Sequence, residues 1–415
     1  MFRAGRAEPR EGPVYDLPVG INRPLTGLGS PTYPIIMKRL RYVLILAVLG
    51  FTGCPGNSEP PPIFLGHVAN LSGADRSGKQ AEQGIRLALQ QLTDHNLAES
   101  LGGRPLNVRH ADTKGQIEGY ESVAARMTQV NRVVGLIGGF TPDEVTRLDH
   151  AKLPVLTLAG VRPAGTSEMV FAVGMRPGQQ AFVLAKYIGE ELPLRDVVVL
   201  ADDRREDFLA VADAFSRYFV DTRRNRPKAA PAALTTIRFG KDANWDDLAK
   251  LIAERKSIEA VVFAGKARDW LEIRRKQALA VPLVFAGDDG EVVNLLGADA
   301  EKTIYHATAF APDKDAPDGQ VFIHKYREAF KEEPDVAAAL GYEALELFAE
   351  ALKAAGPTFA PDKVLPALRE VKDLQGLAGK LTMTKEQYVR RPLFVVRLQA
   401  GVATTLKRYE ADALP

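Results

Sequence analysis

The chain has 415 residues and carries 54 lysine and arginine side chains against 52 aspartate and glutamate side chains. This balance argues against a nucleic-acid partner, which would require a clustered excess of positive charge. The only cysteine is Cys54, so residues 55–415 hold no internal disulfide, and their number exceeds what one hydrophobic core usually serves, which predicts two lobes.

Residues 1–36 are rich in arginine, proline and glycine and show no hydrophobic period, which is typical of a disordered segment. Met37 is a second candidate for the start of translation. The sequence leaves two interpretations open, a disordered extension or a misassigned start.

Residues 37–53 have the three parts of a secretory signal: a basic cluster, a short apolar run and small residues before a cleavage site. The apolar run is about half of the roughly 20 residues that a spanning helix needs. The stretch LGFTGC, which ends at Cys54, resembles the lipobox of bacterial lipoproteins. That resemblance implies a diacylglycerol on the Cys54 thiol and residues 54–62 as a tether. An ordinary cleaved signal and an uncleaved anchor are the alternatives.

From residue 63 onward, short apolar runs alternate with stretches that have helical periodicity. Such alternation predicts parallel sheets that are covered by helices on both faces. The first series has predicted strands at 63–69, 105–111, 133–139, 153–160 and 169–174, with predicted helices at 81–92 and 119–130.

A second series of the same kind begins after residue 180. Its predicted strands are 196–203, 233–239, 258–265 and 282–290, and its predicted helices are 182–192, 206–219, 245–255 and 267–279. Three helices then follow without an intervening strand, at 321–330, 337–355 and 361–371, and three antiparallel strands close the chain, at 379–384, 392–399 and 404–411. The predicted fold class is α/β, with two doubly wound parallel-sheet lobes.

The ordered set of motifs resembles the type I periplasmic binding proteins, in the branch of the leucine and branched-chain amino-acid receptors of ABC transporters. The resemblance begins with GHVANLSGADRSGKQAEQGIRLAL and GGRPLNVRHADTKGQIEGYESVAARM, continues through LPVLTLAG and FIHKYREAFKEEPDVAAALGYEALELFAEALKAAG, and ends with LQGLAGKLTMT. It implies two lobes that are joined by three crossing strands and close on a ligand by a hinge motion.

We expect the crossings near Met175, His306 and Thr382. The expected first lobe is therefore 63–175 plus 307–381, and the expected second lobe is 176–306 plus 382–410. In open parallel sheets, ligands bind beyond the carboxyl ends of the strands, against helix N-termini.

In the first lobe, the candidate ligand contacts follow three predicted strands. In the amino-acid receptors, serine and threonine hydroxyls and backbone N–H groups of two of these loops hold the ligand carboxylate. Thr141 matches one hydroxyl position, whereas Val161 occupies the position of the other, which weakens the case for an α-amino-acid ligand. The candidate residues are Ser72, Thr141, Pro142, Ala159 and Val161.

In the second lobe, the candidates are Glu206, Lys266 and Asp289. The family places a carboxylate at the position of Asp289, where it pairs with the ligand ammonium. Glu206 stands where the family tends to have a tyrosine, which suggests a more polar site. Each carboxylate also has a structural interpretation as a solvated side chain or helix cap, and Arg204 and Arg205 are interpreted as surface charge.

No nucleophile elbow, phosphate-binding loop, dinucleotide-binding loop or metal-ligand cluster occurs in the sequence, so we expect neither an enzyme nor a cofactor or metal. The predicted function is capture of a small polar metabolite, an amino acid or a related compound, and its delivery to an ABC transporter permease, from a periplasmic or cell-surface position on a lipid anchor. The alternatives are a ligand-sensing receptor for a membrane signalling partner and an acid/base enzyme that uses Asp202, Asp203 or Asp289.

Overall fold

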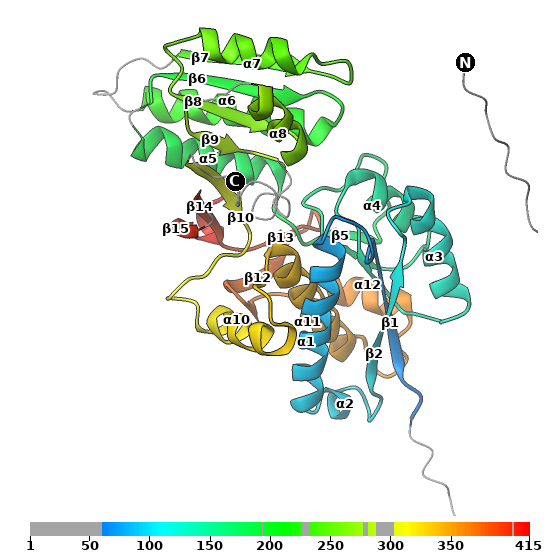
Figure 1. The fold of residues 1–415 in the computed structure, drawn as a ribbon. Helices are drawn as coiled ribbons and strands as arrows, with labels where there is room; N and C mark the ends of the chain where they lie inside the picture. Colours follow the sequence, from blue (N-terminus) through cyan, green and yellow to red (C-terminus); the bar gives the residue numbers. More distant parts are fainter. Residues whose placement is uncertain (1–59, 193, 226–232, 277–280, 288–302, 401) are drawn as a thin grey trace, which may run out of the picture. The chain divides into compact units, whose positions relative to one another are not determined.

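Figure 1 presents the computed structural model, which describes residues 60–192, 194–225, 233–276, 281–287, 303–400 and 402–415. These residues belong to one unit, Glu59–Pro415. Two predicted sites, Cys54 and Asp289, lie outside the described residues, as do the predicted segments 1–36 and 37–53.

The first sheet contains five parallel strands in the order β2-β1-β3-β4-β5. The strands are β1 (Ile63–Ala69), β2 (Leu106–Asp112), β3 (Leu136–Gly138), β4 (Val155–Thr157) and β5 (Val170–Ala172). Gly138 and Gly139 end β3 because both have positive φ angles, 149° and 79°. A Cβ on Gly138 would also lie 2.1 Å from the Val68 carbonyl oxygen.

Helices cover both faces of the first sheet. Side chains of a strand point alternately to the two faces of the sheet. Ile63 and Leu65 point to one face and share a core with residues of α1 and α11. Val68 points to the other face and shares a second core with residues of α3 and α4. The helices are α1 (Ser77–Asp94), α2 (Leu97–Ser100), α3 (Ile117–Gln129), α4 (Pro142–Asp149), α10 (Pro317–Phe330), α11 (Val336–Ala355) and α12 (Pro361–Arg369).

The second sheet contains seven strands in the order β15-β14-β10-β9-β8-β6-β7. Strands β6 to β10 pair in parallel, in the same relative order as the first sheet, and β14 and β15 add antiparallel strands at one edge. The strands are β6 (Asp196–Asp202), β7 (Ala233–Phe239), β8 (Ala260–Ala264), β9 (Leu283–Phe285), β10 (Ile304–Thr308), β14 (Leu393–Gln399) and β15 (Val402–Tyr409).

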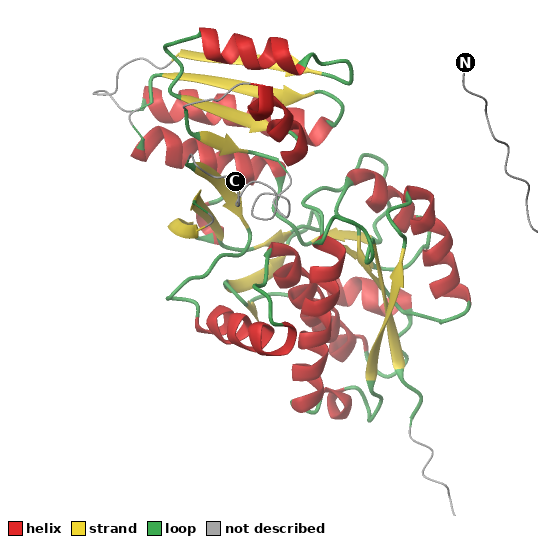
Figure 2. Ribbon diagram, in the orientation of Figure 1, coloured by secondary structure: helices red, strands yellow, loops and turns green. Residues whose placement is uncertain are grey.

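The alternation of β6 shows how the second sheet is buried on both faces. Val197 and Val199 belong to the core that contains residues of α5 and α6, whereas Val198 and Leu200 belong to the core that contains residues of α7 and α8. Figure 2 shows the strands lying among these helices. The helices are α5 (Pro177–Glu191), α6 (Glu206–Arg224), α7 (Trp245–Glu254) and α8 (Ala267–Lys276), and the chain closes with a short 3₁₀ helix, Ala411–Ala413.

A third sheet of three short antiparallel strands follows α12: β11 (Leu374–Gly376), β12 (Gly379–Met383) and β13 (Val389–Arg390). Three connections link the second sheet and its helices to the rest of the fold: 173–176 after β5, 309–316 after β10, and 391–392 between β13 of the third sheet and β14. Met175 lies in the first of them. His306 lies inside β10 and Thr382 inside β12, so the expected lobe boundaries at 306 and 382 each cut a strand.

The predicted fold class is confirmed: both halves are α/β, with parallel strands and helices in alternation. The helices α2 and α4, the closing 3₁₀ helix and the strands β10, β11 and β13 were not predicted. The signal for α4 was present, because Thr141, Pro142 and Glu144 form the start of a capping box, with threonine at the N-cap and glutamate three residues later.

Candidate ligand-binding site

The loop after β1 is held by the carboxylate of Asp112, which ends β2. Its Oδ1 accepts hydrogen bonds from the backbone N–H groups of Leu71 (2.9 Å) and Lys114 (2.8 Å). Burial opposes ionisation of Asp112, but hydrogen bonds from Ser72 and from these N–H groups lower its pKa below the ordinary value. Ser72 therefore has a structural partner within the loop, and its role as a ligand contact stays a prediction.

The loop after β3 leads into the N-terminus of α4. Two backbone N–H groups of this loop donate hydrogen bonds to a side chain of α4 itself. The Glu144 carboxylate oxygen Oε2 accepts hydrogen bonds from the N–H groups of Phe140 (2.7 Å) and Thr141 (3.2 Å). Thr141 Oγ1 in turn accepts one from the Glu144 N–H at 3.4 Å, and Pro142 takes the first helical position.

Burial raises the pKa of Glu144, although the two N–H groups and Tyr120 act in the opposite direction. The glutamate thus fills with its own carboxylate the helix N-terminus at which an anionic ligand would otherwise bind. Glu144 was not among the predicted site residues, although it stands three residues after Thr141, which is the spacing of a capping box.

The loop after β4 contains Ala159 and Val161. The Ala159 N–H donates to the Gly139 carbonyl at 2.9 Å, and the Ala159 carbonyl accepts from the Gly174 N–H at 3.2 Å. Val161 is half-buried and packs against the core that contains Val68. These contacts use the backbone groups of Ala159 inside the fold and give Val161 an apolar environment.

At the carboxyl end of β6, a charged cluster joins the loop to α8. Arg204 donates to the buried Asp202 through two bonds, Nε to Oδ1 (2.7 Å) and Nη2 to Oδ2 (2.6 Å), and it also pairs with Asp269 of α8. The hydrogen bond to Asp202 is the first cause that raises the pKa of Arg204. Arg204 is exposed, in agreement with its interpretation as surface charge, and a two-bond ion pair fixes its position. Arg205 departs from that interpretation, because it is half-buried and pairs with Asp207.

The two described candidates of this half lie on neighbouring strand ends. Glu206 is the exposed first residue of α6, after β6. Lys266 is exposed and precedes α8, where its carbonyl accepts hydrogen bonds from the N–H groups of Asp269 (3.0 Å) and Trp270 (3.3 Å). Since β6 and β8 are paired, the loops that carry these side chains share one edge of the second sheet.

In the first sheet too, the candidate loops share one edge, because the pairing of β1 with β3 and of β3 with β4 brings the loops of Ser72, Thr141 and Ala159 together.

Within the described ranges, no three histidine, cysteine, aspartate or glutamate side chains form a group that suits a metal ion. None of the described helices combines the length and the apolar character needed to cross a membrane.

Two sheets whose parallel strands repeat one order, each with loops at the carboxyl edge of those strands, are typical of a two-lobed α/β ligand-binding protein. A family model for the periplasmic binding proteins matches residues 62–223 and 261–403. The chain belongs to the periplasmic binding protein family.

Individual relatives agree with this assignment. The Leu/Ile/Val-binding protein homolog 3 of Brucella melitensis is 26% identical over 380 residues, which are 86% of this chain and 96% of that protein. The leucine-binding protein LivK of Thermotoga maritima has a TM-score of 0.69 at 20% identity, over 85% of this chain and 100% of that chain.

Two further solved structures contain ligands. LivJ of Streptococcus pneumoniae, in complex with isoleucine, has a TM-score of 0.66 at 20% identity and covers 83% of this chain and 99% of its own. A solute-binding protein of R. palustris, in complex with benzoate, has a TM-score of 0.67 at 18% identity and covers 85% and 97%. At these identities the likeness concerns the fold.

Proposed function

We propose that this protein is an extracytoplasmic solute-binding protein, which captures a small polar metabolite and delivers it unaltered to the permease of an ABC transporter. The observation that supports this function most strongly is the family match, which extends over strands of both parallel sheets. The ligand would bind at the carboxyl edges of these sheets, where Ser72, Thr141, Glu206 and Lys266 lie on loops.

The structure of the α4 N-terminus bears on the ligand. Isoleucine and benzoate, the ligands of two structural relatives, both carry a carboxylate. In this chain Glu144 takes the N–H groups of Phe140 and Thr141, and Val161 offers no hydroxyl. We propose that the ligand is held chiefly through other polar groups, as in an amide or an amino acid bound through its ammonium group.

A thermal-shift screen of amino acids, amides, urea and small carboxylates tests the proposal on the chain from residue 55 onward. We expect at least one hit, with micromolar affinity by calorimetry, and a smaller radius of gyration by X-ray scattering when the ligand is bound. A ligand that is hydrolysed or oxidised, or one that binds without compaction, would contradict the function.

Asp289 is proposed as the partner of a ligand ammonium. Asp289→Ala should weaken binding by about tenfold or more, since a charge-assisted hydrogen bond contributes about 1.5–3 kcal/mol. Asp221→Ala is the matched control, because Asp221 lies in the last turn of α6, at the opposite end from the β6 loop, and its side chain is 63% exposed.

Export and anchoring form a second part of the proposal, with Cys54 as the lipidated residue. Cys54→Ser should move the protein from the membrane fraction to the soluble fraction, and unchanged retention would count against a lipid anchor. The sensing alternative predicts a different partner: affinity capture from membranes would recover a sensor kinase instead of a permease.

A further inference from the structure

A cavity of about 340 Å³ lies among α1, α10, α11 and β11. Its floor is made of the buried side chains of Phe322, Tyr342 and Leu377, and its walls carry polar groups, among them Gln91, Asp318 and Glu346. This volume is in the range of small-molecule sites, and an apolar floor with a few polar groups is their usual composition.

The cavity is separate from the loops at the carboxyl edge of the first sheet. Those loops lead into α1 at Ser77, whereas the cavity contacts α1 at Gln91, near the other end of the helix. With a rise of 1.5 Å per residue, the two positions are about 20 Å apart along the helix axis.

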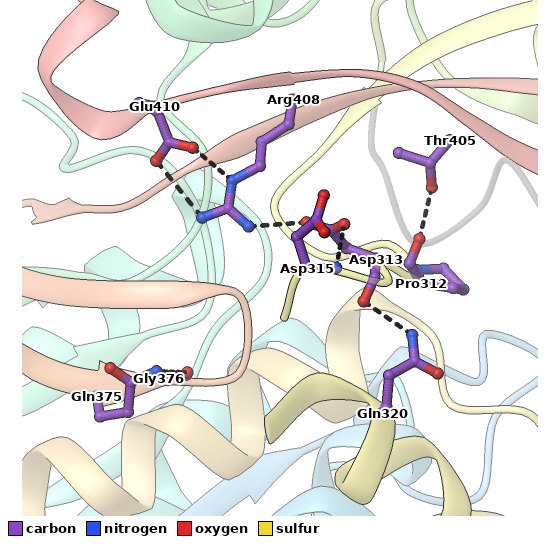
Figure 3. Close-up of polar contacts among 9 residues, drawn as sticks. All are labelled: Pro312, Asp313, Asp315, Gln320, Gln375, Gly376, Thr405, Arg408 and Glu410. Carbon is purple, nitrogen blue, oxygen red and sulfur yellow. Dashed lines mark hydrogen bonds and ion pairs between the residues drawn. The ribbon is translucent and has the colours of Figure 1, made fainter. Parts of the chain in front are cut away.

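Two acidic side chains, Asp318 and Glu346, line this cavity. Asp318 stands at the N-terminus of α10, where its Oδ2 accepts a hydrogen bond from Gln375 Nε2 at 2.9 Å. The carboxylate of Glu346 lies on the wall from α11, next to the hydroxyl of Tyr342, which donates to Gln91. Gln375 and Gly376 of β11 also line the cavity, and Figure 3 shows the two residues side by side.

The groups around Glu346 leave its charge poorly compensated. The nearby carboxylate of Glu343 is itself bound to Arg391 at 2.6 Å, and Asp318 adds further negative charge. The hydroxyl of Tyr342 and the ammonium group of Lys353 act in the opposite direction on the pKa of Glu346. His95 and Lys325 are exposed at the rim. Burial, together with Glu343, raises the pKa of Glu346 to about 8.

We propose that this cavity is a second small-molecule site, which binds a compact amphipathic amine. The ammonium group lies between Asp318 and Glu346, and the apolar body lies on Phe322 and Leu377. An ammonium donates hydrogen bonds to both carboxyl groups and compensates the charge of Asp318 and, above the pKa of Glu346, of Glu346 as well. The aromatic ring of Phe322 also favours a cation.

Titration calorimetry of the full-length protein with 2-phenylethylamine, with 3-phenylpropionate as the anionic counterpart, tests the site. We expect saturable binding of the amine alone, and a rise in affinity from pH 6.5 to pH 8.5 as Glu346 ionises. At pH 8.5, where Glu346 is ionised, Glu346→Gln and, independently, Asp318→Asn should each weaken binding about tenfold, the equivalent of one charge-assisted hydrogen bond.

Asp318 is exposed, so Asp318→Asn keeps the test valid if Glu346→Gln does not fold. Glu328→Gln is the control on α10, with a side chain that is 66% exposed and outside the cavity lining, and it should bind the amine as the unaltered protein does. Absence of saturable amine binding, equal binding of the carboxylate, or full affinity in both cavity variants would each overturn the proposal. None of these results bears on solute capture at the sheet edges.

Discussion

At the scale of single residues, a buried ion pair fastens the third connection between the sheets. Arg391 stands between β13 and β14, and its Nη1 donates to Glu343 Oε2 of α11 at 2.6 Å. Both side chains are nearly inaccessible, at 3% and 2% exposure, and Glu343 Oε1 also accepts a hydrogen bond from the Leu377 N–H. The pair therefore joins three elements that are distant in sequence.

Arg391→Met should lower the free energy of unfolding in urea by about 3–5 kcal/mol, because it leaves the Glu343 carboxylate buried without its cation. The double variant Arg391→Met with Glu343→Leu removes both charges and should recover much of this loss. Equal stabilities of the single and double variants would show that burial of the unpaired charge is not the cause.

A histidine pair, in which His67 is buried and His110 half-buried, gives the fold a dependence on pH. Nδ1 of His67 on β1 lies 3.1 Å from Nδ1 of His110 on β2, so one neutral ring donates to the other. Burial lowers the pKa of His67 well below its ordinary value, and the neighbouring His110 adds to this effect. Burial also lowers the pKa of His110 to about 4, although Glu82 opposes the shift.

Because the folded-state pKa values are depressed, the unfolded chain binds more protons as the pH falls below about 6.5. The contribution of the neutral histidine pair to the free energy of unfolding is therefore fully present above that pH and is lost as the pH falls toward 4. Between pH 7 and pH 5, we expect the free energy of unfolding to fall by about 1–2 kcal/mol from His110 alone. His110→Gln, which retains a donor for His67, should flatten this profile in urea titrations at each pH; an unchanged slope would contradict the assignment.

At the scale of elements, α1 and α11 approach closely through glycines. A Cβ on Gly84 of α1 would lie 1.9 Å from the Ala338 carbonyl oxygen, and a Cβ on Gly341 of α11 would lie 2.5 Å from that of Ala81. The obstacles are backbone atoms, so a side chain cannot be accommodated without moving one helix.

Gly84→Ala should therefore destabilise the fold by about 1–3 kcal/mol, as overpacking does. The matched control is Gly178→Ala near the start of α5, where a Cβ would meet no atom within 4 Å. There the substitution should be neutral or stabilise by up to about 1 kcal/mol, since alanine is the better helix former. Thermal unfolding of both variants distinguishes the two effects, and similar transition temperatures would refute the close packing.

At the scale of the whole molecule, the second connection between the sheets is fastened by charge. Arg408 of β15 donates from Nη1 to Asp313 Oδ2 in the segment 309–316, and from Nε to Glu410 Oε1, each at 2.7 Å. Thr405 Oγ1 donates to the Pro312 carbonyl at 2.8 Å, and Figure 3 shows how these groups surround the segment. The contacts hold a stretch of chain that any hinge motion would involve.

Arg408→Gln should accelerate amide hydrogen exchange in residues 312–320 by about tenfold, because it removes a charge-assisted bond from the partly buried Asp313. Lys380→Gln, which disrupts an ion pair whose side chains are 67% and 70% exposed, is the control and should change exchange little. Equal exchange in both variants would mean that Arg408 does not restrain the connection.

Much of the fold was predictable because its signals are local. The predicted strand 63–69 coincides with β1, where an apolar run between turn residues is almost wholly buried. The predicted strand 233–239 coincides with β7, which lies at the edge of the second sheet and is buried only at Phe239. That the loops of Ser72, Thr141, Glu206 and Lys266 follow parallel strands was predictable from the alternation of strands and helices, because parallel strands bring their carboxyl ends to a common edge. The choice of residues within these loops also used the family resemblance, and their contact with a ligand stays a prediction. The capping box at the start of α4 is also a local signal, and it would have predicted this helix.

Local spacing of apolar, helical and turn residues in the sequence was enough to predict the α/β class and most of the strands and helices, and the ordered set of motifs along the chain pointed to the family by resemblance. Which side chains meet depends on the tertiary structure: Arg204 with Asp269, Glu343 with Arg391, and the cavity that contains Asp318 and Glu346. These partners lie tens of residues apart, and no periodic pattern links them. Their contacts exist only once the sheets and helices have packed, because packing sets both the distances and the burial that give a charge its partner.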